Sequence, residues 1–372
     1  MSKAKSKNLS PSQIAWRKLI SNKLSLFGLI VIISFLLVAI LGPTIRPDTS
    51  PKANSQYIEL ARKPPGFSVK MLKVKNTSEV GFFKAWIYGF DPQYKSIPIF
   101  SKQIVDEVIR AEKYTGNTPN DGEVIEIPIH DLYGSTIEKS IYKKYFWLGT
   151  DRYGRDMLSR LMAGTWISFT VGFISILISL VIGISLGAAA GFYRGKFDDF
   201  VMWFINVVWS IPTLLLVIAI TLALGKGFWQ VFVAVGLTMW VEVARVVRGQ
   251  VIGIREMEYI EAGKALGFKD FRIISKHIIP NITGPVIVIS AANFAAAILI
   301  EAGLSFLGLG AQPPQATWGK MISEHKGYII TGDAYLAIFP GIAIFLLVLS
   351  FVLLGNGLRD AFDTEGAKNV NI

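Results

Sequence analysis

Residues 257–280 read MEYIEAGKALGFKDFRIISKHIIP and form a polar interruption in a chain that is otherwise mostly apolar. Glu258, Glu261 and Lys264 recur every three residues, as on one face of a helix. Gly267 follows, and glycine accepts the positive φ that ends a helix without steric cost. The stretch therefore predicts two short helices that are hinged at Gly267.

The second helix is expected to begin near Asp270, because negative charge is favoured at a helix N-terminus. Phe271, Ile274 and Ile278 are expected to share its apolar face. Pro280 is expected to end it. A polar helix pair between apolar segments cannot lie in lipid, so we expect it to pack on another protein at the membrane surface.

The composition indicates an integral membrane protein. Of the 372 residues, 52% are hydrophobic and only 17% are charged, against about 25% charged in a soluble domain. The net charge of +11 does not indicate nucleic acid here, because basic residues on the cytoplasmic side orient membrane spans. The chain has no cysteine, and its three histidines lie far apart in sequence, so we expect neither a disulfide nor a metal site.

Six apolar stretches are long enough, at roughly 20 residues, to cross the hydrocarbon core. The first, over 24–43, follows a basic tail (1–23) and is interpreted as an uncleaved span with its N-terminus inside. The others are expected at about 166–192, 200–224, 228–247, 282–309 and 334–354. The basic residues of the loop 248–281 place that loop in the cytoplasm, together with both termini and the tail 361–372.

Residues 44–147 differ in composition, with dense, nearly balanced charge and frequent proline and glycine. Alternating patterns predict strands over 67–74 and 123–129, and 101–114 predicts an amphipathic helix. With the first span oriented as above, this region is a small mixed α/β insert outside the cytoplasm, between the first and second spans. We expect it to dock a binding protein or to cover the external mouth, with a plain spacer as the alternative.

Polar residues within the predicted spans are candidates for a translocation path, because ionisable groups there usually face a cavity or a partner. They are Glu301, Asn293 and Asn206, with Glu242 near the cytoplasmic end of the fourth span. A hydrogen bond in helix packing is the alternative. Ser210-Ile211-Pro212 is expected to break the third span, either as a gating hinge or as a fixed kink.

Three glycines, Gly183, Gly187 and Gly191, recur every four residues in the second span and predict close helix packing. The sequence has no nucleophile–base arrangement and no GxxxxGK[ST] phosphate loop. We therefore expect no catalytic residue, no cofactor and no ATP bound by this chain.

Several motifs together resemble the second permease subunit of oligopeptide and dipeptide ABC importers. Residues 149–160 resemble its GTDxxGRDxxSR signature, 301–319 its ExxLSFLGLGxxPPxxxWG segment, and 355–360 its closing GDGLRD, with asparagine for aspartate. The signature residues are Gly149, Thr150, Asp151, Gly154, Arg155 and Asp156. Ion pairs that hold an interfacial helix, formed among the charged residues of 151–160, are a simpler interpretation of this element than catalysis.

The opening stretch resembles the EAA loop of the same permeases, with Glu261-Ala262-Gly263 for Glu-Ala-Ala and Gly267 four residues on. Gly263 departs from the pattern and is expected to loosen its helix by up to about 1 kcal/mol. The alternative, a helix on anionic lipid, is disfavoured by the acidic residues of the first helix. The residues expected to contact an ATPase are Glu258, Glu261, Ala262, Gly263, Leu266, Gly267 and Phe268.

The resemblance implies an all-α membrane protein with the six spans of an ABC importer permease, in the plasma membrane of a bacterium. It implies a homologous second permease subunit, two ATPase subunits that bind ATP and Mg²⁺, and an extracytoplasmic binding protein or lipoprotein. Oligopeptides or dipeptides are the implied cargo, with nickel chelates or glutathione as alternatives. A self-sufficient channel or secondary transporter would not need the cytoplasmic helix pair, and an intramembrane enzyme is disfavoured by the missing catalytic residues.

Overall fold

The computed structural model describes residues 11–76, 94–105, 107–116, 118–119, 121–134, 136–225 and 227–362. The ends of both predicted tails, 1–10 and 363–372, lie outside the described residues. The chain divides into two compact units. We call them the helical unit (Met1–Phe35, Ser168–Gly310 and Ile344–Ile372) and the sheet unit (Leu36–Ile167 and Ala311–Ala343).

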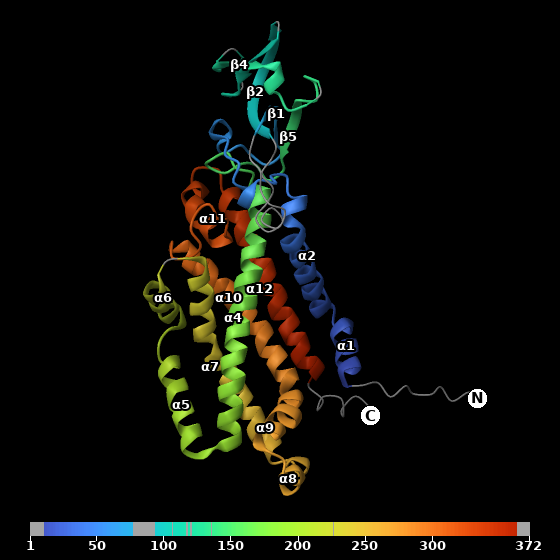
Figure 1. Ribbon diagram of the computed structural model, residues 1–372, viewed down its shortest axis with the longest axis vertical. Coiled ribbons are helices and arrows are strands. Elements are labelled where there is room, and N and C mark those ends of the chain that lie inside the picture. The colour runs from blue at the N-terminus through green and yellow to red at the C-terminus, as the bar shows by residue number, and fades with distance from the viewer. Residues whose placement is uncertain are drawn as a thin grey trace, which may run out of the picture. The chain divides into compact units, whose positions relative to one another are not determined.

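Long apolar helices dominate the chain (Figure 1). The helices are α1 (Pro11–Ser21), α2 (Lys23–Ile45), α4 (Met157–Tyr193), α5 (Gly195–Trp209), α6 (Thr213–Leu224), α7 (Phe228–Arg255), α8 (Glu258–Ala265), α9 (Asp270–Ile273), α10 (Thr283–Phe306), α11 (Trp318–His325) and α12 (Tyr335–Phe362). Within the described residues, five helices are long and apolar enough to cross a membrane: α2, α4, α7, α12 and α10 together with the turns before it. The bent pair α5 and α6 raises that number to six if it is one span.

Several predicted helix ends were wrong. Helix α4 begins at Met157, before the predicted 166, and α12 continues to Phe362, beyond the predicted 354. The first span continues through Pro43 to Ile45, because a proline in the last turn removes only one backbone hydrogen bond. Helix α7 continues to Arg255, so residues 248–255 belong to this helix and not to the loop predicted over 248–281.

The predicted break of the third span at 210–212 is confirmed. Helices α5 and α6 meet at 91°. Pro212 has no N–H to continue the helical ladder. The Ile211 N–H donates instead to the Val208 carbonyl, at 3.2 Å, and closes the last turn of α5.

Helices α4 and α7 pack closely through the predicted glycine series (Figure 1). A Cβ atom on Gly187 would lie 2.4 Å from the Ala244 carbonyl oxygen, and one on Gly183 would lie 2.6 Å from Val243 Cβ. Glycine lets the two backbones approach where a side chain would clash. The close packing predicted from the spacing is therefore confirmed.

The sheet unit holds one antiparallel sheet in the order β4-β3-β2-β1-β5. Met71 of β1 pairs with Pro98 of β2 on one side and with Tyr142 of β5 on the other. Successive residues of a strand face opposite sides, and Met71 and Leu72 accordingly enter different buried clusters. The strands are β1 (Phe67–Lys75), β2 (Tyr94–Val105), β3 (Val108–Lys113), β4 (Val124–Pro128) and β5 (Ile141–Phe146).

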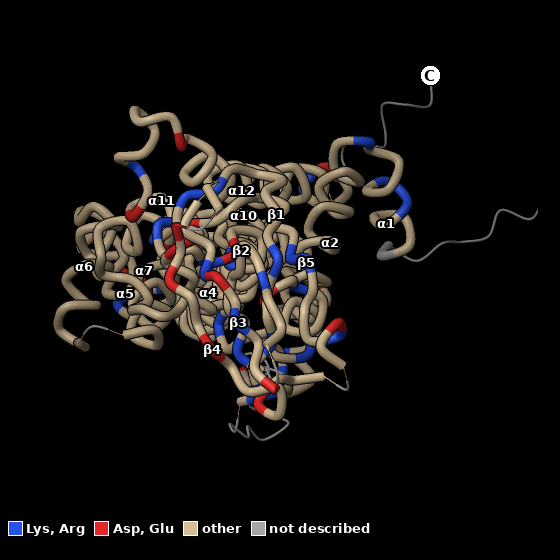
Figure 2. The backbone as a smooth tube through the Cα atoms, turned by 90° about the horizontal axis from the view of Figure 1, so that it is seen from above, with Lys and Arg blue, Asp and Glu red and all other residues tan. Residues whose placement is uncertain are grey.

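The strands predicted at 67–74 and 123–129 are confirmed, but the helix predicted over 101–114 was wrong. Strands β2 and β3 occupy this region and pair Val105 with Val108 and Gln103 with Arg110. The branched side chains that flank the turn favour strand over helix. Where this insert is described, it contains strands and single helical turns, and no α-helix. Charges of both signs lie along the strands (Figure 2).

Candidate functional site

Helix α8 is short and has a well-defined end. Glu258 and Glu261 lie in its first turn, where the helix dipole favours negative charge. At its end the Phe268 N–H donates to the Gly263 carbonyl at 3.0 Å, and the Gly267 N–H donates to the Lys264 carbonyl at 2.9 Å. This is a Schellman motif, and Gly267 has a φ of 75°. The hinge predicted at Gly267 is confirmed.

The second helix does not end at Pro280, as the sequence had predicted. Helix α9 continues through a π-helical turn (Ile274–Ile278) and a 3₁₀ turn (Ile279–Ile282) into α10. Pro280 lacks the N–H that would bond to the carbonyl four residues back, and such a lost bond is accommodated by the wider turn. The Asn281 side-chain amide donates to the His277 carbonyl at 2.6 Å.

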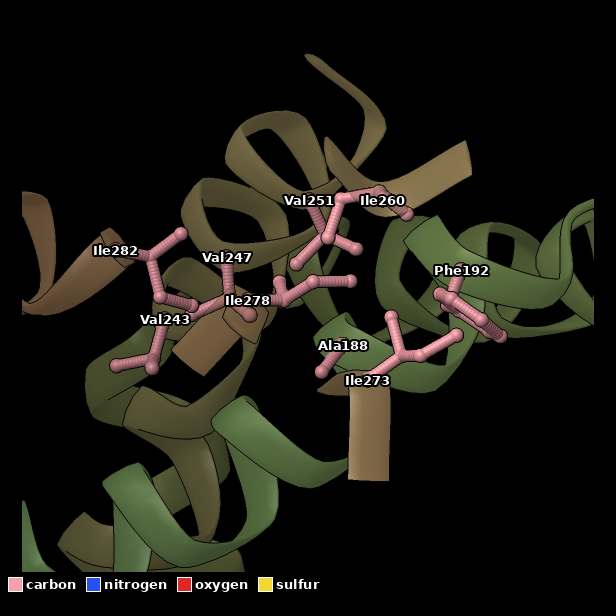
Figure 3. Packing of buried hydrophobic residues seen from close by; sticks show 9 residues of the cluster. All are labelled: Ala188, Phe192, Val243, Val247, Val251, Ile260, Ile273, Ile278 and Ile282. Atoms are coloured by element: carbon pink, nitrogen blue, oxygen red, sulfur yellow. The ribbon is translucent and has the colours of Figure 1, made fainter. Parts of the chain in front are cut away.

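One side of the 257–280 segment is anchored in a buried cluster (Figure 3). Ile260 of α8, Ile273 of α9 and Ile278 of the π turn are at most 1% exposed. Each such fully buried side chain contributes about 1.5–3 kcal/mol to stability. The segment is therefore firmly attached to the ends of α4 and α7, whose contributions are Ala188 and Phe192, and Val243, Val247 and Val251.

Two apolar side chains of the segment, Leu266 and Phe271, are exposed, and we call this pair the apolar knob. Their exposed fractions are 74% and 81%. Tyr259 and Met257 are also exposed. Phe271 was expected to share a face with Ile274 and Ile278, but it is exposed, whereas Ile278 is buried and Ile274 is partly buried. Exposed apolar side chains on an anchored support are typical of a protein docking surface.

The remaining predicted contact residues differ in accessibility. Glu258, Glu261 and Ala262 are exposed, whereas Gly263 is buried. Phe268 is partly buried: the Arg272 guanidinium lies 4.3 Å from its ring centroid, and the His277 ring stacks at 6.0 Å. These contacts hold the Phe268 ring against the second half of the segment.

The structure does not bring the candidate path residues together. Glu301 and Asn293 lie on α10 and are 2% exposed. Glu301 Oε1 accepts a hydrogen bond from Ser305 Oγ at 2.6 Å. Asn206 lies on α5, where its Oδ1 accepts a hydrogen bond from Arg245 at 3.0 Å. Glu242, by contrast, is exposed and lines a pocket.

The signature residues form a buried polar node in the sheet unit. Asp151 is fully buried and lies 2.6 Å from Arg155 Nε and 3.7 Å from Arg160 Nε. Asp156 Oδ1 accepts the Ser159 N–H at 2.7 Å at the start of α4, which caps that helix. The ion pairs predicted here are confirmed for Asp151, Arg155 and Arg160, whereas Asp156 acts as a helix cap.

The other signature residues shape the backbone of this node. Gly149 and Gly154 have φ values of 76° and 70°, which favour glycine. The Thr150 hydroxyl accepts a hydrogen bond from the Lys63 N–H at 2.8 Å and also bonds to the Leu60 carbonyl. These contacts hold the start of α4 in place.

Two family models match the chain. One is described as a binding-protein-dependent transport system inner membrane component and matches residues 180–365, which are 186 of the 372 residues. The other is the N-terminal transmembrane domain of oligopeptide transport permease C, over residues 10–65.

Several curated relatives match this chain over most of their length. The glutathione transport system permease protein GsiD of Pectobacterium atrosepticum is 42% identical over 59% of this chain and 72% of its own. The dipeptide permease protein DppC of Bacillus subtilis is 42% identical over 59% and 68%. The oligopeptide permease protein OppC of Bacillus subtilis is 38% identical over 60% and 72%.

Among solved structures, a chain of the MetNI methionine ABC transporter in an inward-facing conformation matches with a TM-score of 0.47. It is 20% identical and covers 55% of this chain and 97% of its own. The family match over half of the sequence and the identity to the curated permeases agree with each other. The chain belongs to the family of inner membrane components of binding-protein-dependent transport systems.

Proposed function

We propose that this chain is a permease subunit of an ATP-driven ABC importer, and that the 257–280 segment receives the motion of the ATPase subunits. The observation that carries this proposal is the apolar knob of Leu266 and Phe271, which is exposed on one side of a segment whose other side is buried. A surface of this kind suits a groove on a partner protein. Lipid is a poor alternative, because Glu258 and Glu261 are exposed on the same segment and anionic headgroups would repel them.

The proposed transmission follows the contacts of the buried cluster. Closure of the ATPases on ATP displaces the knob. Ile260, Ile273 and Ile278 pass that displacement to α4 and α7, since they pack directly on both helices. A packed core moves as a body, because it does not deform continuously. The spans then change from inward-facing to outward-facing, and cargo enters the opened cavity.

The proposed assembly contains this chain, a homologous second permease subunit and two cytoplasmic ATPase subunits that bind ATP and Mg²⁺. An extracytoplasmic binding protein or lipoprotein delivers the cargo. The bent pair α5 and α6 counts as one of six spans, both termini are cytoplasmic, and the membrane is the plasma membrane of a bacterium. The basic residues of the 257–280 segment and its flanks support this orientation.

Short peptides are the proposed cargo. Two of the relatives are named for dipeptides and oligopeptides. The relative named for glutathione favours a second candidate of the same chemistry, because glutathione is itself a short peptide. Uptake of a labelled dipeptide, competed with glutathione or with a nickel chelate, separates these cargoes. The proposal fails if the assembled complex imports no peptide in the presence of ATP.

The sheet unit is proposed to receive the binding protein. Tyr145 and Trp147 are 48% and 64% exposed, and their rings stack at 6.1 Å at the end of edge strand β5. The Lys143 ammonium lies 5.0 Å from the Tyr145 ring centroid. Exposed aromatic side chains beside a cation are typical of protein interfaces. Unchanged affinity for the binding protein in a Trp147→Ala, Tyr145→Ala variant would contradict this assignment.

A further inference from the structure

Glu242 is an exposed carboxylate in the middle of an apolar helix. It lies on α7 (Phe228–Arg255), one of the helices long and apolar enough to cross a membrane. In the described part of the chain, no side chain pairs with or hydrogen-bonds to this carboxylate. An ionised group in a span is costly unless it faces water or a partner of opposite charge.

The carboxylate opens into a pocket of about 140 Å³ in the angle of the bent pair. Trp209 and Ile211 at the end of α5, Thr213 and Leu216 at the start of α6, and Ile300 of α10 form most of its wall. The Thr238 hydroxyl, also at the pocket, donates to the Val235 carbonyl at 2.8 Å. Glu242 is therefore the charged group of an otherwise largely apolar pocket.

The basic residues that follow Glu242 on α7 are engaged elsewhere. The Arg245 guanidinium lies 3.7 Å from the Trp209 ring centroid and donates to Asn206 at 3.0 Å. One turn further, Arg248 binds Asp198 at 2.6 Å. Each cation is held by a contact with α5, so neither neutralises Glu242. The carboxylate is left available to a cation that comes from outside this chain.

We propose that Glu242 recognises the ammonium group of a peptide in transit, in the pocket at the α5–α6 bend. This inference rests on the proposed function. A metal ion fits poorly, because hard cations need six or more oxygen ligands and the pocket walls are mainly carbon. An ammonium group can be bound by one carboxylate, through a charge-assisted hydrogen bond. The apolar walls do not select one particular side chain next to the ammonium group of the peptide, and this suits a transporter of varied peptides.

A cysteine in the pocket wall tests whether peptide reaches the pocket while Glu242 is kept. The natural chain contains no cysteine, so Thr213→Cys, at an exposed position of the pocket wall, provides a single thiol in this subunit. The assembled transporter, with binding protein and ATP, is treated with a charged thiol reagent, and labelling of this chain is measured by mass. Ala244→Cys, at a fully buried position of α7, is the control.

Labelling at position 213 is expected, at a rate that saturating dipeptide lowers at least fivefold, while position 244 stays unlabelled. No labelling at position 213, or labelling that dipeptide does not slow, overturns the proposal.

Dipeptide uptake tests whether the negative charge of Glu242 is needed. Glu242→Gln is expected to lower dipeptide uptake about tenfold in proteoliposomes, which corresponds to about 1.4 kcal/mol, and Glu242→Asp is expected to retain most of it. Asp199→Asn, which removes an exposed carboxylate on α5 outside the pocket, is expected to match wild type. Wild-type uptake by Glu242→Gln overturns this inference alone. A wild-type complex that imports no peptide overturns the proposed function instead.

Discussion

Gly263 and Gly267 lie four positions apart in the 257–280 segment but need glycine to different degrees. Gly267 has a φ of 75°, a conformation that costs an L-residue roughly 1–2 kcal/mol. Gly263 lies inside α8, and a Cβ atom there would make ordinary contact with the Phe268 ring at 3.4 Å. Only Gly267 is therefore required by the backbone.

Alanine at the two positions is expected to have opposite effects. Gly263→Ala should stabilise the helix by up to about 1 kcal/mol, because glycine is a poor helix former. Gly267→Ala should destabilise the protein by about 1–2 kcal/mol, because the left-handed conformation is strained. Thermal unfolding of the purified chain measures both. A lower Tm for Gly263→Ala would show that the Phe268 ring cannot accept the methyl group.

His325 makes stability depend on pH. It is 1% exposed, and burial lowers the pKa of its imidazole below the ordinary value. Nδ1 lies 2.7 Å from the Met321 carbonyl oxygen. Nε2 has no hydrogen-bond partner in the described part of the chain, so a proton there would be buried without an acceptor.

The direction follows from proton binding. Above pH of about 6.5 the imidazole is neutral in both the folded and unfolded states, and stability is unaffected. Below it the unfolded state takes up the proton first, so stability is lost as pH falls towards the lowered pKa. His325→Gln is expected to flatten the change in Tm between about pH 8 and pH 5. An equally steep acid loss in that variant would assign the effect to other groups.

At the scale of elements, sequence patterns predicted the hinge but not the orientation of the second helix. Gly267 predicts a positive φ at its own position, because glycine adopts that conformation without steric cost. The outward position of Phe271 depends on the register of the π turn before Pro280 and on which isoleucine fits the α4–α7 packing, neither of which is a local property. The helix prediction for 101–114 was wrong for the same reason, since pairing with neighbouring strands decides the structure of this region.

The α4–α7 contact leaves no room for an added methyl group at Gly187. Gly187→Ala places a Cβ atom 2.4 Å from the Ala244 carbonyl oxygen, and overpacking of this kind costs about 1–3 kcal/mol. Gly249 is also helical, but nothing lies within 4 Å of the corresponding position. Gly249→Ala should therefore stabilise α7, by roughly 1 kcal/mol. Equal Tm values for the two variants would contradict the close packing.

At the scale of the whole molecule, apolar length indicated the membrane-spanning helices, and basic residues suggested an orientation. These signals are strong because lipid imposes them on every span. The candidate path was less predictable: Glu301 and Glu242 look alike in sequence, yet one is buried against its neighbours and the other opens into a pocket. The prediction of peptide cargo rested on the motif resemblance, because no single residue of the sequence indicates which cargo is carried.

The central claim is that the ATP-driven motion of the partner ATPase subunits is transmitted to this chain through the apolar knob. Leu266→Asp replaces a side chain that is 74% exposed, so the fold should be retained while the docking contact is lost. Ile330→Asp, at a position that is 91% exposed in the sheet unit, is the control for charge on an exposed apolar site.

The decisive measurement is ATP-driven peptide uptake by proteoliposomes that contain the assembled complex. We expect uptake with the wild-type chain and with Ile330→Asp, and a loss of at least about tenfold, or about 1.4 kcal/mol of coupling, with Leu266→Asp. Unchanged uptake by the Leu266→Asp complex, or peptide uptake by this chain without ATPase subunits, would contradict the claim.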